Sequence, residues 1–492
     1  MKYTIAIDQS TSATKALLFD DDCQLVAQQS EAHRQYYPKP GWVEHDAIEI
    51  YANTIRVVKR LVEPYLKPEN SFSVAITNQR ETVVLWDRTT GIPIANAVVW
   101  QCMRGVDICN QLKADGYSDL VKERSGLLID PYFAGSGARW LLDNVEGARK
   151  KAEEGNLCFG TIDSWLIFKL TEGREHLTDY TNASRTMLFN IHTLDWDDDL
   201  LRMLDIPRKM MPKALPCDSI FGKTTFEGLF IEPISIAGVL GDSHGALIGQ
   251  MCYRAGLGKA TYGTGSSVMV NIGETAAKAP EGLVTSIGFA ALNKVFYAFE
   301  GNIHSTGATI QWLKERLMLI GNASETEAIA TSVPDNGGVY FVPAFAGLGA
   351  PWWNDKAKAM ICGLTLASTK AHVCRAALES IAYQVSDLIY AMTRSAGIQL
   401  EEIRVDGGPT KNRFLMQMQS DLLQVNVVRA EVEDASAFGA LVMNGFATKR
   451  WNSFEEAAKI WNADTPIQPK RTAEEMQPLY DGWNRAIGML LR

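Results

Sequence analysis

The chain has 492 residues, 46% of them apolar and 21% charged, with a formal net charge of −9 at pH 7. This length exceeds what one hydrophobic core usually supports, so we expect about two to four globular domains. The ordinary composition excludes a disordered or fibrous protein. The acidic balance argues against a nucleic-acid partner, because such a partner needs a basic patch.

Eight cysteines are scattered along the chain without a CxxC pair or the spacing of a metal site. This pattern is typical of reduced, packed thiols and predicts a cytoplasmic protein. The sequence opens directly into a predicted strand, and it has no apolar run of about 18 residues, the length that a membrane-spanning helix needs. We therefore expect neither secretion nor membrane insertion.

The first predicted element is a hairpin over residues 4–20. Its first strand ends in Asp8, and the hydroxyl residues Ser10, Thr11 and Ser12 form the turn. A carboxylate at a strand end can bind Mg²⁺, while hydroxyl and backbone N–H groups can hold phosphate oxygens. The same pattern fits an ordinary polar turn, which is the better interpretation of this segment in isolation.

The segments that follow mix strands with an amphipathic helix. Strands are predicted over residues 23–29, 72–77, 83–87 and 97–100, and a helix is predicted over residues 48–61 after a loop rich in Pro and Gly. Alternation of this kind predicts an α/β fold.

The middle of the chain repeats the N-terminal design. A buried-strand pattern over residues 234–241 ends in Asp242, and a strand, a small polar turn and another strand follow over residues 260–271, with Thr264 and Gly265 in the turn. This second hairpin favours the phosphate-holding interpretation of the first. The chain therefore consists of two related halves.

The boundary between the halves is expected near residue 245. We predict one domain over residues 1–245 and another over residues 246–492, with residues 216–233 as a connecting region. No shorter tandem repeat or low-complexity tract is found.

The common phosphate-binding loops do not accompany these hairpins. Residues 222–224 resemble the end of GxxxxGK[ST], but Cys217 stands where the first glycine belongs, and no GxGxxG follows a predicted strand. A nucleotide site must therefore use the paired hairpin turns and glycine-rich helix starts. In residues 405–412, two glycines precede a helix predicted over residues 414–423; they can bring backbone N–H groups to a ligand or form only a tight turn.

A set of separate segments then points to a family. The segments are 41–46, 78–82, 99–101, 130–133, 241–242 and 359–379. The last of them is similar to the second signature of the FGGY carbohydrate kinases, and the others are similar to the glycerol-kinase-like branch of that family. The resemblance runs from about residue 3 to about residue 485, with the segments in the same order.

The resemblance implies an α/β fold with two ribonuclease-H-like (actin-like ATPase) domains. Each domain would have a mixed five-stranded sheet flanked by helices, and an interdomain cleft would separate the N-terminal sugar- or polyol-binding side from the C-terminal nucleotide-binding side. The implied activity is phosphorylation of a hydroxyl group of a small polyol or sugar by ATP with Mg²⁺. Members of the family are often homodimers or homotetramers.

The resemblance also assigns roles to the two strand-end carboxylates. Asp8 and Asp242 would flank the Mg²⁺ and phosphate groups, and Asp242 would accept the proton of the acceptor hydroxyl, which can accelerate the reaction ~10²–10⁴-fold. Asp242 can also be a turn or helix-cap residue without a catalytic role.

The implied acceptor-binding and ATP-binding residues come from both halves. Arg80, Glu81, Trp100, Tyr132, Asp242 and Ser243 are expected to bind the polyol or sugar, and Ser10, Thr11, Ser12, Thr264, Gly265, Gly307, Gln311, Gly408 and Asn412 are expected to bind ATP. Without the resemblance, residues 80–81 fit a solvated ion pair, Trp100 fits core packing, and Gln311 fits the exposed side of an amphipathic helix.

Some residues depart from the family pattern. Ser243 stands where glycerol kinases have Gln, residues 266–267 are Ser-Ser in place of Cys-Phe, and Gly137 replaces a Lys that is more scaffold than chemistry. The smaller side chains predict a larger, more polar pocket for a four- or five-carbon polyol or ketose. His244, two residues after Asp242, either contacts a substrate hydroxyl or is packed in the core.

Two other functions remain open at this point. The chain can be a catalytically silent actin-like protein that binds nucleotide as a sensor or assembly component. It can also be a kinase for carboxylate acceptors, although no arginine cluster for an acid group is evident.

Overall fold

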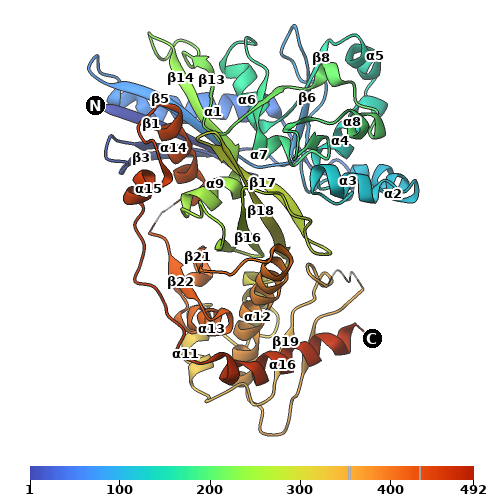
Figure 1. Ribbon diagram of the computed structural model, residues 1–492, viewed down its shortest axis with the longest axis vertical. Coiled ribbons are helices and arrows are strands. Elements are labelled where there is room, and N and C mark those ends of the chain that lie inside the picture. Colours follow the sequence, from blue (N-terminus) through green and yellow to red (C-terminus); the bar gives the residue numbers. More distant parts are fainter. Residues whose placement is uncertain (353, 355, 432–433, 492) are drawn as a thin grey trace.

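Two mixed β-sheets organise the chain into two lobes (Figure 1). The structure is a computed structural model that describes residues 1–352, 354, 356–431 and 434–491. Figure 1 shows the sheet with β1 and β5 in the upper lobe, and the sheet with β16, β21 and β22 reaching into the lower lobe, where α12 and α16 lie.

The first sheet has the strand order β13-β14-β5-β1-β2-β3. β1 pairs antiparallel with β2 and parallel with β5, so the predicted N-terminal hairpin is present. The strands are β1 (Lys2–Gln9), β2 (Ala13–Phe19), β3 (Leu25–Ala32), β5 (Ser71–Asn78), β13 (Ile220–Thr224) and β14 (Ile234–Gly241).

The second sheet has the strand order β17-β18-β16-β15-β21-β22. β15 pairs antiparallel with β16 and parallel with β21, as β1 pairs with β2 and β5. The strands are β15 (Leu257–Tyr262), β16 (Ser266–Gly273), β17 (Val284–Ala291), β18 (Lys294–Ile303), β21 (Glu402–Asp406) and β22 (Asn426–Arg429). The shared strand pattern agrees with two related halves.

The expected count of five strands for each sheet is wrong, because each sheet has six strands within the described residues. The additional strands lie at edges: β13 pairs antiparallel with β14, and β17 pairs antiparallel with β18. An edge strand presents unpaired backbone groups to which one more strand can add. β13 lies inside residues 216–233, which the sequence suggested were only a connection.

Two helices pack closely where the halves meet. α9 (Asp242–Gly249) follows β14 directly, and α14 (Ala435–Ala447) packs against both α9 and the first sheet. A Cβ atom at Gly249 would collide with the carbonyl oxygen of Ala435, and one at Gly439 would collide with that of Gly245. The backbones therefore touch, and this contact fixes α9 against α14.

The remaining elements surround the two sheets. α1 (Ala47–Val62) begins at the cap residue Asp46, whose carboxylate accepts from the N–H of Ile48 at 2.8 Å. A smaller sheet contains β4 (Glu44–His45), β6 (Val83–Asp87), β7 (Ala97–Val98) and β8 (Leu157–Thr161).

The other helices are α2 (Val106–Ala114), α3 (Ser118–Ser125), α4 (Ala134–Asn144), α5 (Ala148–Glu153), α6 (Ile162–Leu170), α7 (Tyr180–Ala183), α8 (Asp198–Met203), α10 (Gly307–Glu315), α11 (Glu325–Thr331), α12 (Lys370–Ala396), α13 (Arg413–Leu423), α15 (Phe454–Ala457) and α16 (Ala473–Leu490). Short strands occur at β9 (Leu177–Asp179), β10 (Phe189–Asn190), β11 (Asp195–Trp196), β12 (Lys213–Leu215), β19 (Tyr340–Val342) and β20 (Met360–Cys362). Among the described residues, no helix combines the length and apolar character needed to cross a bilayer.

Candidate active site

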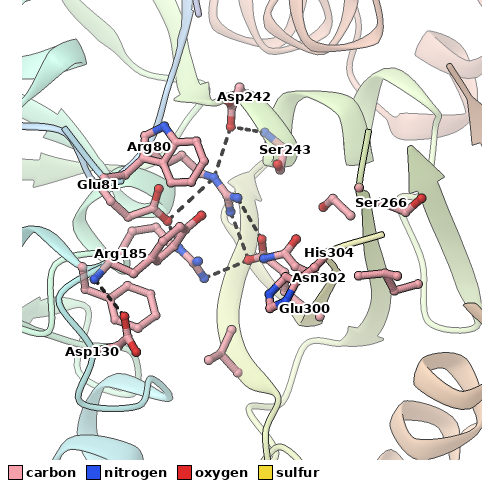
Figure 2. A pocket seen from close by; sticks show the side chains of 18 of the residues that line it. Arg80, Glu81, Asp130, Arg185, Asp242, Ser243, Ser266, Glu300, Asn302 and His304 are labelled. Atoms are coloured by element: carbon pink, nitrogen blue, oxygen red, sulfur yellow. Dashed lines mark hydrogen bonds and ion pairs between the residues drawn. The ribbon is translucent and has the colours of Figure 1, made fainter. Parts of the chain in front are cut away.

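A cavity of about 660 Å³ lies between the two halves of the chain. Its wall includes Trp100, Tyr132 and Asp242 from the first half, and residues 265–267 and 300–304 from the second. Figure 2 shows side chains from both halves pointing into it. The structure therefore brings the predicted acceptor-binding residues together in one place.

Arg80 connects the two halves at the centre of this cavity wall. It follows β5, and its guanidinium group donates to both carboxylate oxygens of Glu300 on β18, at 3.0 and 2.8 Å. Its Nε lies 3.1 Å from Oδ1 of Asp242 (Figure 2). Because Arg80 is only 5% exposed, these contacts are much less screened than ion pairs at the surface.

Arg185 completes a buried charge network with Arg80, Glu81 and Glu300. Its Nε donates to Glu81 at 2.6 Å, and its Nη1 lies 2.8 Å from Glu300. Burial opposes ionisation of Glu300, but the guanidinium groups of Arg185 and Arg80 outweigh it and hold the pKa of Glu300 well below its usual range. The solvated ion pair that the sequence left open for residues 80–81 is therefore excluded.

Glu81 also adopts an unusual backbone conformation. Its φ angle of 63° lies in the left-handed region, which costs a non-glycine residue on the order of 1–3 kcal/mol unless the surroundings enforce it. Burial raises the pKa of Glu81, while Arg80 and Arg185 lower it. The network thus holds a strained, buried carboxylate against the cavity.

Asp242 is the first residue of α9, and its side chain is 35% exposed beside the buried Arg80. Both the Nε of Arg80 and the N–H of Ser243 contact the same oxygen, Oδ1, the latter at 2.6 Å. The second oxygen has no hydrogen bond to another described residue, so it can accept a proton from a ligand in the cavity.

His244 is fully buried, and neither ring nitrogen has a hydrogen-bond partner among the described residues. Burial, followed by the charge of Arg80, holds its pKa well below the usual value. It does not line the cavity. Of the two interpretations left open by the sequence, the packed histidine is the one that the structure supports.

Two aromatic rings form another part of the cavity wall. Trp100 and Tyr132 meet edge to face with centroids 5.5 Å apart, and both line the cavity. The indole Nε1 of Trp100 donates to the hydroxyl of Thr11 at 3.0 Å. Trp100 is thus more than core packing, because it joins the aromatic wall to the turn of the first hairpin.

Asp8 lies at the end of β1 and is buried, with its Oδ1 lacking a hydrogen bond. Burial, followed by the negative charge of Asp434, raises its pKa, and Lys15, 3.7 Å away, opposes this. The described residues contain no group of three or more side chains that could hold a metal ion. Mg²⁺ typically binds one or two carboxylates together with substrate phosphates, so an unpartnered oxygen of Asp8 near the charge of Asp242 fits that ion.

The turn of the second hairpin is held by backbone contacts at glycines. A Cβ at Gly265 would collide with the carbonyl oxygen of Ile303, and a Cβ at Gly307 would lie 2.5 Å from that of Gly263. The N–H groups of Gly307 and Ala308 donate to the carbonyls of Gly263 and Thr264 at 3.0 Å. The structure thereby brings Thr264, Gly265 and Gly307 together.

A third glycine, Gly407, makes a similar contact with the end of β15, since a Cβ there would collide with the carbonyl oxygen of Tyr262. Its φ of 95° is also a conformation that side chains rarely adopt. We call Gly265, Gly307 and Gly407 the close glycine contacts. They place residues 408–412 beside the second hairpin.

The other predicted ATP-binding residues do not line the described cavity. Asn412 caps α13 by accepting from the N–H of Leu415 at 3.0 Å, and Gln311 donates to Glu315 at 3.0 Å on the exposed side of α10. Gly408 is exposed, Ser10 closes its own turn through the carbonyl of Ala13, and Ser12 points to solvent. Only Thr11 and Gly265 of the predicted ATP-binding set line the cavity in the described part of the chain.

Comparison with known proteins decides the family. The model of the FGGY carbohydrate kinase N-terminal domain matches residues 3–249, and that of the C-terminal domain matches residues 258–448. The chain belongs to the FGGY family of carbohydrate kinases.

Other proteins and solved structures are similar to this FGGY kinase over nearly its whole length. It is 49% identical to glycerol kinase 2 of Thermotoga maritima, over 100% of this chain and 99% of that protein, and 48% identical to a glycerol kinase of Caldanaerobacter subterraneus, over 99% and 98%. The crystal structure of Plasmodium falciparum glycerol kinase with ADP aligns with a TM-score of 0.96 at 34% identity, over 100% and 99% of the chains.

The xylulose kinase of Lactobacillus acidophilus, at 20% identity with a TM-score of 0.89 over 99% of both chains, shares the fold. This FGGY kinase is an ATP-dependent phosphotransferase that acts on a hydroxyl group, as its family and relatives indicate. The catalytically silent alternative has no support from these comparisons.

Several residues that line the cavity of this kinase were not predicted from the sequence, notably Arg185, Glu300, Asn302 and His304. A signal existed for Glu300, because a lone acidic residue inside an otherwise apolar strand must have a buried partner. No local pattern indicated Arg185, since its partners are distant in sequence.

The departures from the family pattern fall in two places. Ser243, Ser266 and Ser267 line the cavity, whereas Gly137 on α4 is buried against Val83 and Val98 and does not.

Proposed function

We propose that this FGGY kinase transfers the γ-phosphoryl group of ATP to a hydroxyl group of glycerol. The observation that carries the proposal is the buried charge network, which fixes Arg80 and Glu81 beside Asp242 in a cavity walled by Trp100 and Tyr132. Full-length relatives of about half-identical sequence are named glycerol kinases. They give no support to the four- or five-carbon acceptor expected from Ser243, Ser266 and Ser267.

The acceptor side supplies both directions of hydrogen bonding. An arginine has five N–H donors, and Arg80 retains donors beyond those that contact Glu300 and Asp242. Glu81 accepts from Arg185 through Oε1, and its second oxygen has no hydrogen bond to another described residue. A vicinal diol needs such a donor and acceptor, while the Trp100 ring provides a surface for the carbon chain.

Asp242 then accepts the proton of the reacting hydroxyl. Oδ1 is held by Arg80 and by the N–H of Ser243, which leaves Oδ2 to take the proton as the new P–O bond forms. A neutral alcohol is a poor nucleophile, and a positioned base contributes ~10²–10⁴-fold. The rest of the acceleration comes from positioning and from neutralising charge on the phosphates.

The second half of the chain is proposed as the nucleotide side. Gly265 and its neighbouring turn residues offer hydroxyl and backbone N–H groups to phosphate oxygens, and Thr11, from the hairpin of the first half, adds its hydroxyl on the other side of the cavity. Gly408 and Asn412 stay predicted contacts of ATP. Asp8, with Asp242, would hold Mg²⁺, which neutralises phosphate charge when bound. The domain boundary near residue 245, the cytoplasmic location and the homodimeric or homotetrameric assembly stay predictions.

A panel of acceptors tests the proposal. ADP release by the purified enzyme is measured with glycerol, erythritol, pentitols and pentuloses at saturating Mg-ATP. We expect glycerol to give the highest kcat/KM. A tetritol, pentitol or ketose that exceeds glycerol tenfold would overturn glycerol as the acceptor while leaving the kinase assignment intact.

A further inference from the structure

Lys259 is a buried cation to which the proposed function assigns no role. It lies on the central strand β15 and is 1% exposed. Within the described part of the chain it forms no ion pair with a carboxylate. Its ammonium group instead donates to two hydroxyls, Oγ1 of Thr261 at 3.3 Å and Oγ of Ser267 at 3.2 Å.

These hydroxyls separate Lys259 from the cavity. Thr261 follows Lys259 by two residues on β15 and therefore lies on the same face of the sheet, and Ser267 is its cross-strand partner on β16. Thr261 and Ser267 line the cavity, whereas Lys259 does not. The lysine therefore stands directly behind this part of the wall.

The direction of the two hydrogen bonds decides what the hydroxyls can do. An ammonium group has three donors and no acceptor, so each hydroxyl must accept from it. The proton of each hydroxyl then points elsewhere, and neither hydroxyl donates to another described residue. Both protons are therefore available to an oxygen atom in the cavity.

The surroundings of Lys259 act on its ammonium group in opposite directions. Burial is the largest influence on Lys259 and lowers its pKa; the negative charges of Asp406, Glu300 and Asp242 offset only part of this shift, and Arg80 adds to it. A hydroxyl that accepts from a cation is polarised and becomes a stronger donor, and the effect is larger away from water.

Ser267 faces the proposed acceptor side of the cavity. Its partner on β18 is Asn302, and Asn302 lies two residues after Glu300, on the same face of that strand. Glu300 is the residue that holds Arg80. Figure 2 shows Asn302 and Glu300 side by side at the cavity.

We propose that Lys259, Thr261 and Ser267 form a hydroxyl relay that donates hydrogen bonds to an oxygen of the bound polyol. Lys259 acts as a positioning residue. Ser267 donates a hydrogen bond to an oxygen of the acceptor and so favours acceptors that carry a hydroxyl group at that carbon. The proposal rests on the proposed function. A chain with Phe at position 267 would lack this branch of the relay.

Kinetics of matched variants test the relay. Ser267→Ala and Lys259→Met each raise the KM for glycerol about tenfold, because a charge-assisted hydrogen bond is lost, and leave the KM for ATP within twofold. The double variant has a glycerol KM no higher than that of the single variant with the higher KM, because both changes break the same chain of hydrogen bonds. Lys294→Met, which makes the same chemical change at an exposed lysine, leaves all constants unchanged.

A deoxy acceptor sharpens this test. Wild-type enzyme prefers glycerol over 1,3-propanediol or 1,2-propanediol, and for the diol that lacks the contacted oxygen this preference falls about tenfold in Ser267→Ala. If glycerol and both diols lose the same factor in that variant, or lose none, the relay is overturned. Additive effects of Lys259→Met and Ser267→Ala also overturn it.

Failure of the relay is distinguishable from failure of the glycerol proposal. Should the wild-type enzyme prefer another polyol, the same variant ratios are measured with that polyol, and they decide the relay independently. A wild-type enzyme that phosphorylates no polyol overturns both proposals. Should Lys259→Met fail to fold, by circular dichroism, Ser267→Ala and Thr261→Val decide the outcome through the ratio of glycerol KM to ATP KM.

Discussion

The proposed acceptor side and nucleotide side of the cavity are held in place by different physical means. The buried charge network fixes the acceptor side, through side chains that bond to one another across the two halves. The close glycine contacts fix the nucleotide side, through backbone atoms that touch where no side chain fits. Side-chain chemistry can therefore tune the acceptor side, whereas the turns proposed to hold phosphate depend on backbone shape.

Replacing the proposed base has the largest expected effect on activity. Asp242→Asn preserves the size of the side chain and the hydrogen bond from Ser243, but an amide oxygen does not accept a proton at neutral pH. We expect kcat to fall about 10²–10⁴-fold. Affinity for ATP, measured by calorimetry without acceptor, stays within about threefold of the wild-type value. A variant that retains more than a tenth of the wild-type kcat would contradict the role of Asp242 as base.

Breaking the buried charge network should have the largest effect on stability. Arg185→Met leaves the carboxylates of Glu81 and Glu300 with one guanidinium group between them, and loss of one partner of a buried ion pair typically costs about 3–5 kcal/mol. Thermal unfolding should show a large decrease in Tm, and the KM for glycerol should rise.

The control for this prediction is Arg139→Met on the partly exposed side of α4, where Arg139 pairs with Asp143. Exposed pairs contribute about 0–1 kcal/mol, so its Tm should hardly change. Equal decreases in Tm for the two variants would mean that the buried network contributes no more to stability than the partly exposed pair.

Much of the fold was predictable from the sequence because its signals are local. Both hairpins, α1, β5 and the strand that leads into Asp242 follow from short patterns of apolar residues and turn residues. The edge strand β13 was missed, because a short strand whose pairing depends on β14 resembles an ordinary connection.

The residues of the candidate site also divide into those that local sequence signals predicted and those that they did not. Asp242, Trp100 and Tyr132 were predicted from segments that resemble a family, and the structure places them together. Arg185 and Glu300 were not predicted, because their role arises only when segments more than a hundred residues apart meet. Gln311 and Asn412 bond to Glu315 and to the N–H of Leu415, which are helix neighbours in the sequence; the exposed helix position was the alternative that the sequence offered for Gln311.

A smaller effect is expected when a close glycine contact is disturbed. In Gly265→Ala, the added methyl group would meet the carbonyl oxygen of Ile303, and relieving such overpacking costs about 1–3 kcal/mol. Because the turn must shift, the KM for ATP should rise about tenfold, whereas the KM for glycerol should change less than twofold. Gly488→Ala, at a glycine that like Gly265 has no positive φ but has open space around it, is the matched control. A larger change in glycerol KM than in ATP KM would contradict the division between the two sides.

The smallest expected effect concerns the hydrogen bond that joins the two sides. Trp100→Phe keeps an aromatic surface for the carbon chain but loses the donor to Thr11, and a bond between neutral groups contributes about 0.5–1.5 kcal/mol. We expect the KM for glycerol to rise a fewfold, with a smaller rise for ATP. In a Thr11→Val background the bond is already absent, so Trp100→Phe should add little. If its effect is undiminished there, the Trp100 ring acts on the acceptor alone, and the two sides of the cavity are independent at this point.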